Sequence, residues 1–110
     1  MKAVFFESHG TNDVLKAGER PDPVAGPGQV LVRLEAAALN RLDLFVRDGI
    51  PGVPIALPHV PGADGYGRVE ALGQGVVDLE LGAPVVLQPG LSCGRCEFCR
   101  AGEAVKFCRI

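Results

Sequence analysis

The sequence contains no tryptophan, a single tyrosine and no excess of basic residues. Eleven lysines and arginines stand against thirteen aspartates and glutamates, which gives a formal net charge of −2 at pH 7. A nucleic-acid-binding domain usually presents a basic surface and aromatic side chains on which bases can stack. The two absences therefore argue against a nucleic-acid partner.

Long hydrophobic runs are also missing. The apolar run Ala3–Phe6 ends at Glu7 and is too short to be the core of a signal peptide. No stretch long enough to span a bilayer is free of both proline and charge. We therefore expect a cytoplasmic protein without a membrane partner, in a compartment where thiols stay reduced.

Cysteine is absent from the first 92 residues and then occurs four times within one short segment. The spacing is Cys-x2-Cys-x2-Cys-x8-Cys, formed by Cys93, Cys96, Cys99 and Cys108. Four thiolates this close in sequence can converge on one zinc ion at Zn–S distances of about 2.3 Å. Disulfides between such near neighbours would close very short loops and stabilise the fold little. We predict a structural zinc ion held by all four cysteines.

Two other uses of these thiols remain as alternatives. Consecutive Cys-x2-Cys steps also occur in iron–sulfur ferredoxins, where the fourth cysteine follows a three-residue spacer and precedes a proline. Here the spacer has eight residues and Cys108 precedes Arg109. A redox-active dithiol of the thioredoxin kind needs only one Cys-x2-Cys, placed beside a strand–helix unit.

Fifteen glycines and nine prolines interrupt the chain at short intervals, which favours short strands joined by turns. Apolar and polar residues alternate most clearly from Gln29 to Ala37. Asn40 and Asp43, followed by apolar residues up to Gly49, are typical of a capped short helix. Further strands are expected at residues 2–7, 14–17, 62–72 and 85–88. We predict one mainly β domain, a bent sheet or partly open barrel, with a cysteine lobe at residues 91–110.

Three segments, residues 36–43, 61–70 and 93–103, together resemble the medium-chain dehydrogenase/reductase superfamily. Over nearly its whole length the chain is similar to the N-terminal catalytic domain of a zinc-binding alcohol dehydrogenase or NADPH:quinone reductase-like protein. The resemblance implies a GroES-like β-barrel and a structural zinc in the cysteine lobe. The family usually has one residue fewer before the fourth cysteine, so residues 103–107 must bulge if Cys108 is a ligand.

The resemblance also implies roles for residues outside the lobe. Alcohol dehydrogenases of this family carry a catalytic zinc, with a cysteine at the position of Asn40 and a histidine at that of Ala63. Neither ligand is present, so the chain is more similar to the quinone reductase-like members, which transfer hydride from NADPH without a catalytic metal. On this resemblance Asn40 lies near the nicotinamide, Asp43 holds the local hydrogen-bond network and Asp64 replaces a family glutamate. These three residues are the candidate catalytic residues, and Asn40 is also the candidate cofactor contact.

Each of these residues also has a simpler interpretation. Asn40 and Asp43 can cap a helix, with or without a direct part in chemistry. Asp64 is typical of a turn residue that accepts backbone N–H groups. His59 could replace a missing metal ligand, but a lone histidine in a loop is seldom a ligand without partners nearby.

Two hypotheses for function remain. The first is the N-terminal part of an NAD(P)-dependent, zinc-binding oxidoreductase acting on an alcohol, carbonyl or quinone. The second is a non-enzymatic, zinc-stapled β module used for binding. The 110 residues contain no glycine-rich strand-to-helix turn of the Rossmann kind. Under the first hypothesis the chain is therefore part of a longer enzyme, inactive alone, whose homo-oligomeric parent binds NAD(P)H and a small-molecule substrate through a further domain.

Overall fold

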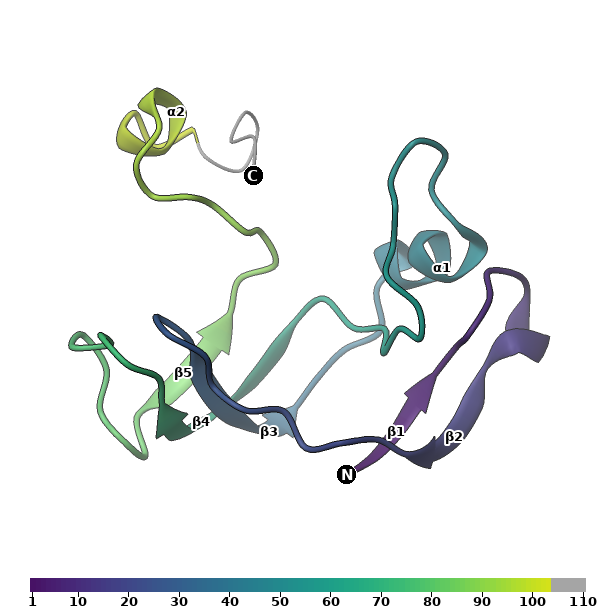
Figure 1. Ribbon diagram of the computed structural model, residues 1–110, viewed down its shortest axis with the longest axis horizontal. Helices are drawn as coiled ribbons and strands as arrows, with labels where there is room; N and C mark the ends of the chain where they lie inside the picture. Colours follow the sequence, from purple (N-terminus) through teal and green to yellow (C-terminus); the bar gives the residue numbers. More distant parts are fainter. Residues whose placement is uncertain (104–110) are drawn as a thin grey trace.

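The computed structural model describes residues 1–103 of the chain. Two antiparallel sheets lie side by side, one of two strands in the order β1-β2 and one of three strands in the order β3-β4-β5 (Figure 1). The elements are β1 (Lys2–Phe5), a 3₁₀ turn (Asn12–Val14), β2 (Lys16–Glu19), β3 (Val30–Ala36), α1 (Arg41–Asp48), β4 (Gly65–Leu72), β5 (Pro84–Leu87) and α2 (Glu97–Arg100). Neither α1 nor α2, the α-helices of the described residues, has the length and apolar character needed to cross a membrane.

The predicted mainly β class with one principal helix is confirmed. The second strand was placed too early, at residues 14–17, because Asn12–Val14 form a 3₁₀ turn and the β1–β2 ladder begins where Lys16 pairs with Phe5. The strand predicted at 62–72 begins at Gly65. Helix α2 was not predicted. Within residues 1–103 the two sheets do not close into a barrel.

The buried core of the described residues is small. Phe6 is fully enclosed and Val69 is 3% exposed, and they are its only two buried hydrophobic residues. Phe6 exchanges two backbone hydrogen bonds with His59, with N···O distances of 3.0 and 2.9 Å, and the two rings lie 5.5 Å apart. This bridge connects the end of β1 to the loop before β4. The chain exposes 8393 Å², well above the about 5,800 Å² typical of a folded monomer of its mass.

Strands β3 and β4 approach each other very closely at Gly67. Gly67 pairs with Leu34 between two irregularities of the β3–β4 register, and it is buried. A Cβ atom at Gly67 would lie 2.1 Å from the carbonyl oxygen of Arg33. Only glycine therefore allows the two backbones to keep this separation.

We predict that Gly67→Ala destabilises the chain by about 1–3 kcal/mol, because the backbone of Arg33 must move away from the added methyl group. The measurement is the midpoint of urea-induced unfolding. The matched control is Gly18→Ala in β2, where the nearest atom to an added Cβ is 3.4 Å away on the ring of Phe5, an ordinary contact. Equal midpoints for Gly67→Ala and the wild type would show that the strands tolerate separation.

Candidate active site and cysteine lobe

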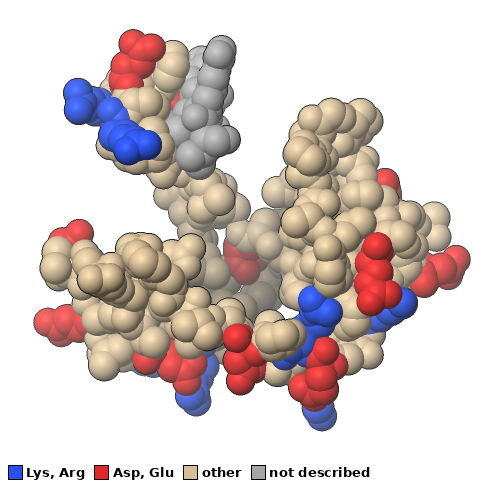
Figure 2. All heavy atoms as spheres, in the orientation of Figure 1, with Lys and Arg blue, Asp and Glu red and all other residues tan. Residues whose placement is uncertain are grey.

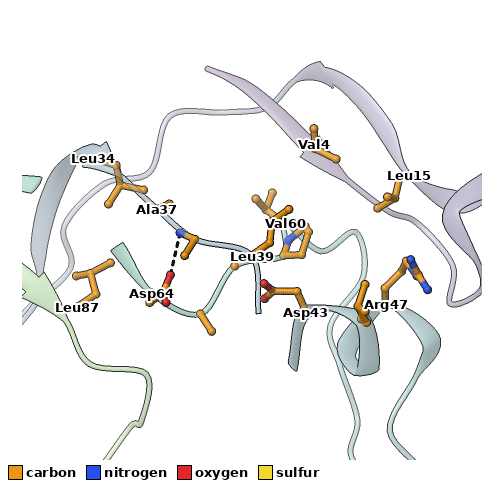
Figure 3. Close-up of a pocket in the computed structure, with 15 residues that line it drawn as sticks. Val4, Leu15, Leu34, Ala37, Leu39, Asp43, Arg47, Val60, Asp64 and Leu87 are labelled. Atoms are coloured by element: carbon orange, nitrogen blue, oxygen red, sulfur yellow. Dashed lines mark hydrogen bonds between the residues drawn. The ribbon is translucent and has the colours of Figure 1, made fainter. Parts of the chain in front are cut away.

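A cavity of about 660 Å³ opens where the two sheets meet α1 (Figure 3). Its walls are mostly apolar and come from both sheets and the loops between them, through Val4, Leu15, Leu34, Leu39, Val60 and Leu87. Three charged residues, Asp43, Arg47 and Asp64, also line the cavity. Figure 2 shows the hollow between the two halves of the molecule, with a largely uncharged rim. The apolar side chains that line it are exposed, from 37% for Leu87 to 96% for Leu39, so it is an open hollow with an apolar lining.

Asn40 and Asp43 form the N-terminal cap of α1. Asn40 has an extended backbone, and its N–H donates to Asp43 Oδ2 at 2.8 Å. The N–H of Asp43 donates to the carbonyl oxygen of Asn40 at 3.0 Å. Asp43 is only 8% exposed, and its negative charge at the positive end of the helix dipole is favourable. The predicted helix cap is confirmed, and it places Asp43 in the cavity wall.

Asp64 connects two loops at the cavity. Its Oδ1 accepts the backbone N–H of Ala38 at 3.1 Å, and its Oδ2 accepts the side-chain amide of Asn40 at 2.9 Å. The hydrogen bond from Asn40, and then that from Ala38, lowers the pKa of Asp64 below its usual value. Asp64 is thus held as a carboxylate that accepts hydrogen bonds, and a proton-donating role for it is not favoured.

Arg47, which the sequence analysis missed, also lines the cavity. Its side chain is 13% exposed, and its Nε donates to the carbonyl oxygen of Gly10 at 3.1 Å. Its other nitrogens bind the carboxylate of Asp48, at 2.7 Å, and the side chain of Asn12. Arg47 therefore fastens α1 to the turn before β2. No local signal in the sequence indicated the contact of α1 with this turn, because Gly10 and Asn12 lie 37 and 35 positions from Arg47.

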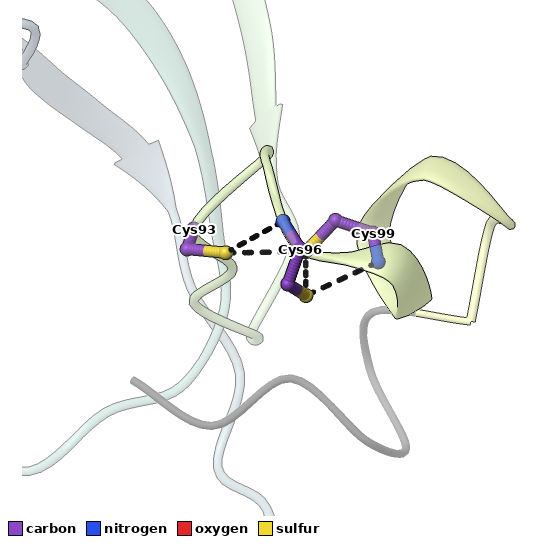
Figure 4. Close-up of side chains that lie close together, drawn as sticks. All are labelled: Cys93, Cys96 and Cys99. Carbon is purple, nitrogen blue, oxygen red and sulfur yellow. Dashed lines mark hydrogen bonds between the residues drawn. The ribbon is translucent and has the colours of Figure 1, made fainter.

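Three of the four predicted zinc ligands come together (Figure 4). The sulfur atoms of Cys93, Cys96 and Cys99 all lie within 4.8 Å of one another, with Cys93–Cys99 and Cys96–Cys99 separations of 3.7 and 3.4 Å. Tetrahedral coordination at a Zn–S distance of about 2.3 Å requires sulfur atoms about 3.8 Å apart. A disulfide would require about 2.05 Å. The predicted fourth ligand, Cys108, lies outside the described residues.

Backbone hydrogen bonds orient the three thiols. The N–H of Cys96 donates to the sulfur of Cys93 at 3.3 Å, and that of Cys99 donates to the sulfur of Cys96 at 3.4 Å. The second bond caps α2, which explains the helix that the sequence analysis missed. These N–H donors fix the positions of the sulfur atoms that would bind the metal. In Figure 1 this lobe stands apart from both sheets at the end of an extended segment.

No second group of metal ligands is assembled in residues 1–103, where the cysteines are the only cluster of three or more possible ligand residues. His59, considered as a replacement ligand, packs its ring against Phe6. Ala63 lines the cavity without a ligand atom. The possible metal ligands near Asn40 are therefore the carboxylates of Asp43 and Asp64, and both carboxylates accept hydrogen bonds from the protein.

Known proteins with similar sequence include oxidoreductases of two kinds. The chain is 45% identical over 75 residues to a zinc-type alcohol dehydrogenase-like protein of Schizosaccharomyces pombe, covering 67% of this chain and 22% of that protein. It is 38% identical over 93 residues to the chloroplastic quinone-oxidoreductase QR1 of Triphysaria versicolor, covering 82% of this chain and 28% of that one. The chain thus spans less than a third of the length of either relative.

Solved structures agree with these relatives. The crystal structure of an NAD-dependent alcohol dehydrogenase superimposes on 98% of this chain, with a TM-score of 0.87 and 51% identity, and the match covers 31% of that enzyme. Residues 26–109 match the family model of the alcohol dehydrogenase GroES-like domain. The chain therefore belongs to the alcohol dehydrogenase GroES-like domain family, within the medium-chain oxidoreductases indicated by its three motif segments.

Proposed function

We propose that this chain forms the N-terminal catalytic-domain portion of an NAD(P)-dependent oxidoreductase that transfers hydride between a nicotinamide and an alcohol, carbonyl or quinone. The observation that carries the proposal is the apolar cavity of about 660 Å³ with the network of Asn40, Asp43 and Asp64 at its wall. Membership of the alcohol dehydrogenase GroES-like family supports it. The cytoplasmic location and the homo-oligomeric state of the full-length enzyme stay parts of this proposal.

The nicotinamide cofactor, when bound, supplies or accepts the hydride, and the residues of this chain prepare the site around it. In the full-length enzyme, once these exposed apolar walls are covered, they would keep water away from the reacting atoms. Asp64 holds the amide of Asn40 in one orientation, since its Oδ2 can accept only from the Nδ2 atom. A fixed amide beside the nicotinamide would orient the ring, and orientation supplies a large share of the rate enhancement of enzymes.

The pyrophosphate and ribose of the cofactor need a different unit. Dinucleotides are held by a glycine-rich strand-to-helix turn, and the 110 residues contain none. We therefore assign cofactor binding to a further domain of the full-length enzyme.

The cysteine lobe has a structural role in this proposal. Cys93, Cys96 and Cys99 fit a tetrahedral zinc site in spacing and orientation, and Cys108 is proposed as the fourth ligand. Four thiolates leave no open coordination position, so the ion would fold the lobe and take no part in hydride transfer. We propose no catalytic zinc, because Asn40 is a poor ligand and Ala63 offers no ligand atom.

We predict one zinc ion per chain, and zinc content well below one in Cys96→Ser, with little change in the far-ultraviolet spectrum because all five strands of residues 1–103 lie before the cysteines in the sequence. Elemental analysis and circular dichroism are the measurements. Iron with sulfide, or four freely titratable thiols in metal-replete protein, would contradict the zinc assignment. Two tightly held zinc ions would instead contradict the absence of a catalytic metal, and His59 would then be examined first.

We predict that the isolated chain gives no fluorescence change with NADPH at micromolar concentrations, whereas the full-length enzyme binds NADPH and oxidises it with a quinone, aldehyde or ketone. Micromolar binding by the isolated chain would show that the glycine loops between Gly62 and Gly75 hold the cofactor. Failure of the full-length enzyme with every such acceptor would favour the non-enzymatic binding module.

We predict that Asp64→Asn lowers the midpoint of urea-induced unfolding at pH 6. The difference in midpoint between the variant and the wild type should narrow as the pH falls below about 3.8. The folded-state pKa of Asp64 is lowered, so its stabilisation is present above the unfolded-state pKa and is lost as the pH falls through the folded value. Asp78→Asn, which removes an exposed carboxylate between β4 and β5, is the matched control. A difference for Asp64→Asn that stays constant between pH 6 and pH 2 would contradict the role of its charge.

A further inference from the structure

The charged groups of the cavity are not all satisfied by protein partners. Asp43 is 8% exposed, and in Figure 3 its carboxylate projects from α1 into the cavity. Its Oδ2 accepts the N–H of Asn40 at 2.8 Å. None of the hydrogen bonds or ion pairs of the described residues involves its Oδ1.

This second oxygen must face the cavity. Among the described residues, no side-chain oxygen or nitrogen that is fully buried lacks a hydrogen-bond partner. Asp43 Oδ1 has no such partner, so it must reach accessible surface, and the cavity is the open space that Asp43 lines. An open carboxylate oxygen at an apolar wall is an acceptor for the donor group of a ligand that covers it.

The neighbouring charged groups do not meet this need. The guanidinium of Arg47, one helical turn further along α1, is directed to Gly10, Asn12 and Asp48. Asp64 is itself an acceptor, and both its oxygens are engaged by Ala38 and Asn40. The polar part of the cavity is therefore rich in acceptors and negative charge.

We propose that Asp43 Oδ1 is a direct ligand contact and a specificity determinant of the cavity, which selects an apolar molecule with a donating hydroxyl or ammonium group. This inference rests on the proposed function and names the polar group of its substrate. A carboxylate accepts hydrogen bonds and donates none, so the oxygen of a ketone or quinone cannot pair with it. A hydrogen bond to a charged acceptor makes the donor ligand bind about tenfold or more tightly.

Three probes of nearly equal shape test the proposal: menthol, menthylammonium and menthone. Their ten-carbon bodies suit a cavity of about 660 Å³. Binding to the 110-residue chain is followed by the NMR shifts of Leu39 and Val60, which line the cavity. We expect menthol and menthylammonium to bind at least about tenfold more tightly than menthone, and the ratio between them separates hydroxyl from ammonium selection.

The variant Asp43→Asn keeps an oxygen to accept the N–H of Asn40 and presents an amide N–H₂ to the cavity. Its preference for menthol over menthone should fall below about twofold or reverse. Asp78→Asn removes the same charge outside the cavity and should keep the wild-type preference. If Asp43→Asn does not fold, the relative affinity of the wild-type chain for menthol and menthone still tests the proposal.

Equal affinity for menthol and menthone in the wild type, no binding of any probe, or an unchanged preference in Asp43→Asn would each overturn the proposal. None of these binding results would bear on the prediction that the full-length enzyme oxidises NADPH. Failure of that oxidation would overturn the proposed function and leave the ligand preference of the cavity standing, so the two failures are distinguishable.

Discussion

Two hydrogen bonds to the carboxylate of Asp64 join chain segments that are 26 and 24 positions apart. They fix the end of β3 and the start of α1 against the segment that leads into β4. The rest of the site depends on this connection, because Asn40 caps α1 and the cap places Asp43 at the cavity. Asp64 thus ties the residue that caps α1 to the segment before β4.

The cavity and the cysteine lobe depend on different forces. In the described part of the lobe, backbone N–H groups directed at sulfur orient the three thiols, and we propose that a zinc ion holds them together. The cavity comes from apolar side chains of both sheets that face each other across about 660 Å³. The proposed structural zinc site and the proposed catalytic cavity therefore lie in different parts of the chain. Loss of the zinc ion need not remove the cavity.

Local patterns in the sequence predicted much of this arrangement. The Cys-x2-Cys-x2-Cys spacing predicted a cluster that forms as three converging thiols, since two-residue spacers allow the chain to turn inward. The pair Asn40 and Asp43 predicted the helix start, because capping involves residues three apart. Contacts between distant segments gave no such signal. The Asp64–Asn40 bond and the bond from Arg47 to Gly10 join segments 24 and 37 positions apart, and the burial of Asp43 follows from packing that no local pattern encodes.

The central claim is that the ionised carboxylate of Asp64 holds the side-chain amide of Asn40. The most direct measurement is a pH titration of the Asn40 side-chain amide resonances in the ¹H–¹⁵N spectrum, with the exposed amide of Gln74 as reference. The account predicts that the Asn40 resonances shift with a midpoint below the usual 3.8 of Asp64, while those of Gln74 do not. Asn40 resonances that do not shift, or that shift at the ordinary value, would contradict it.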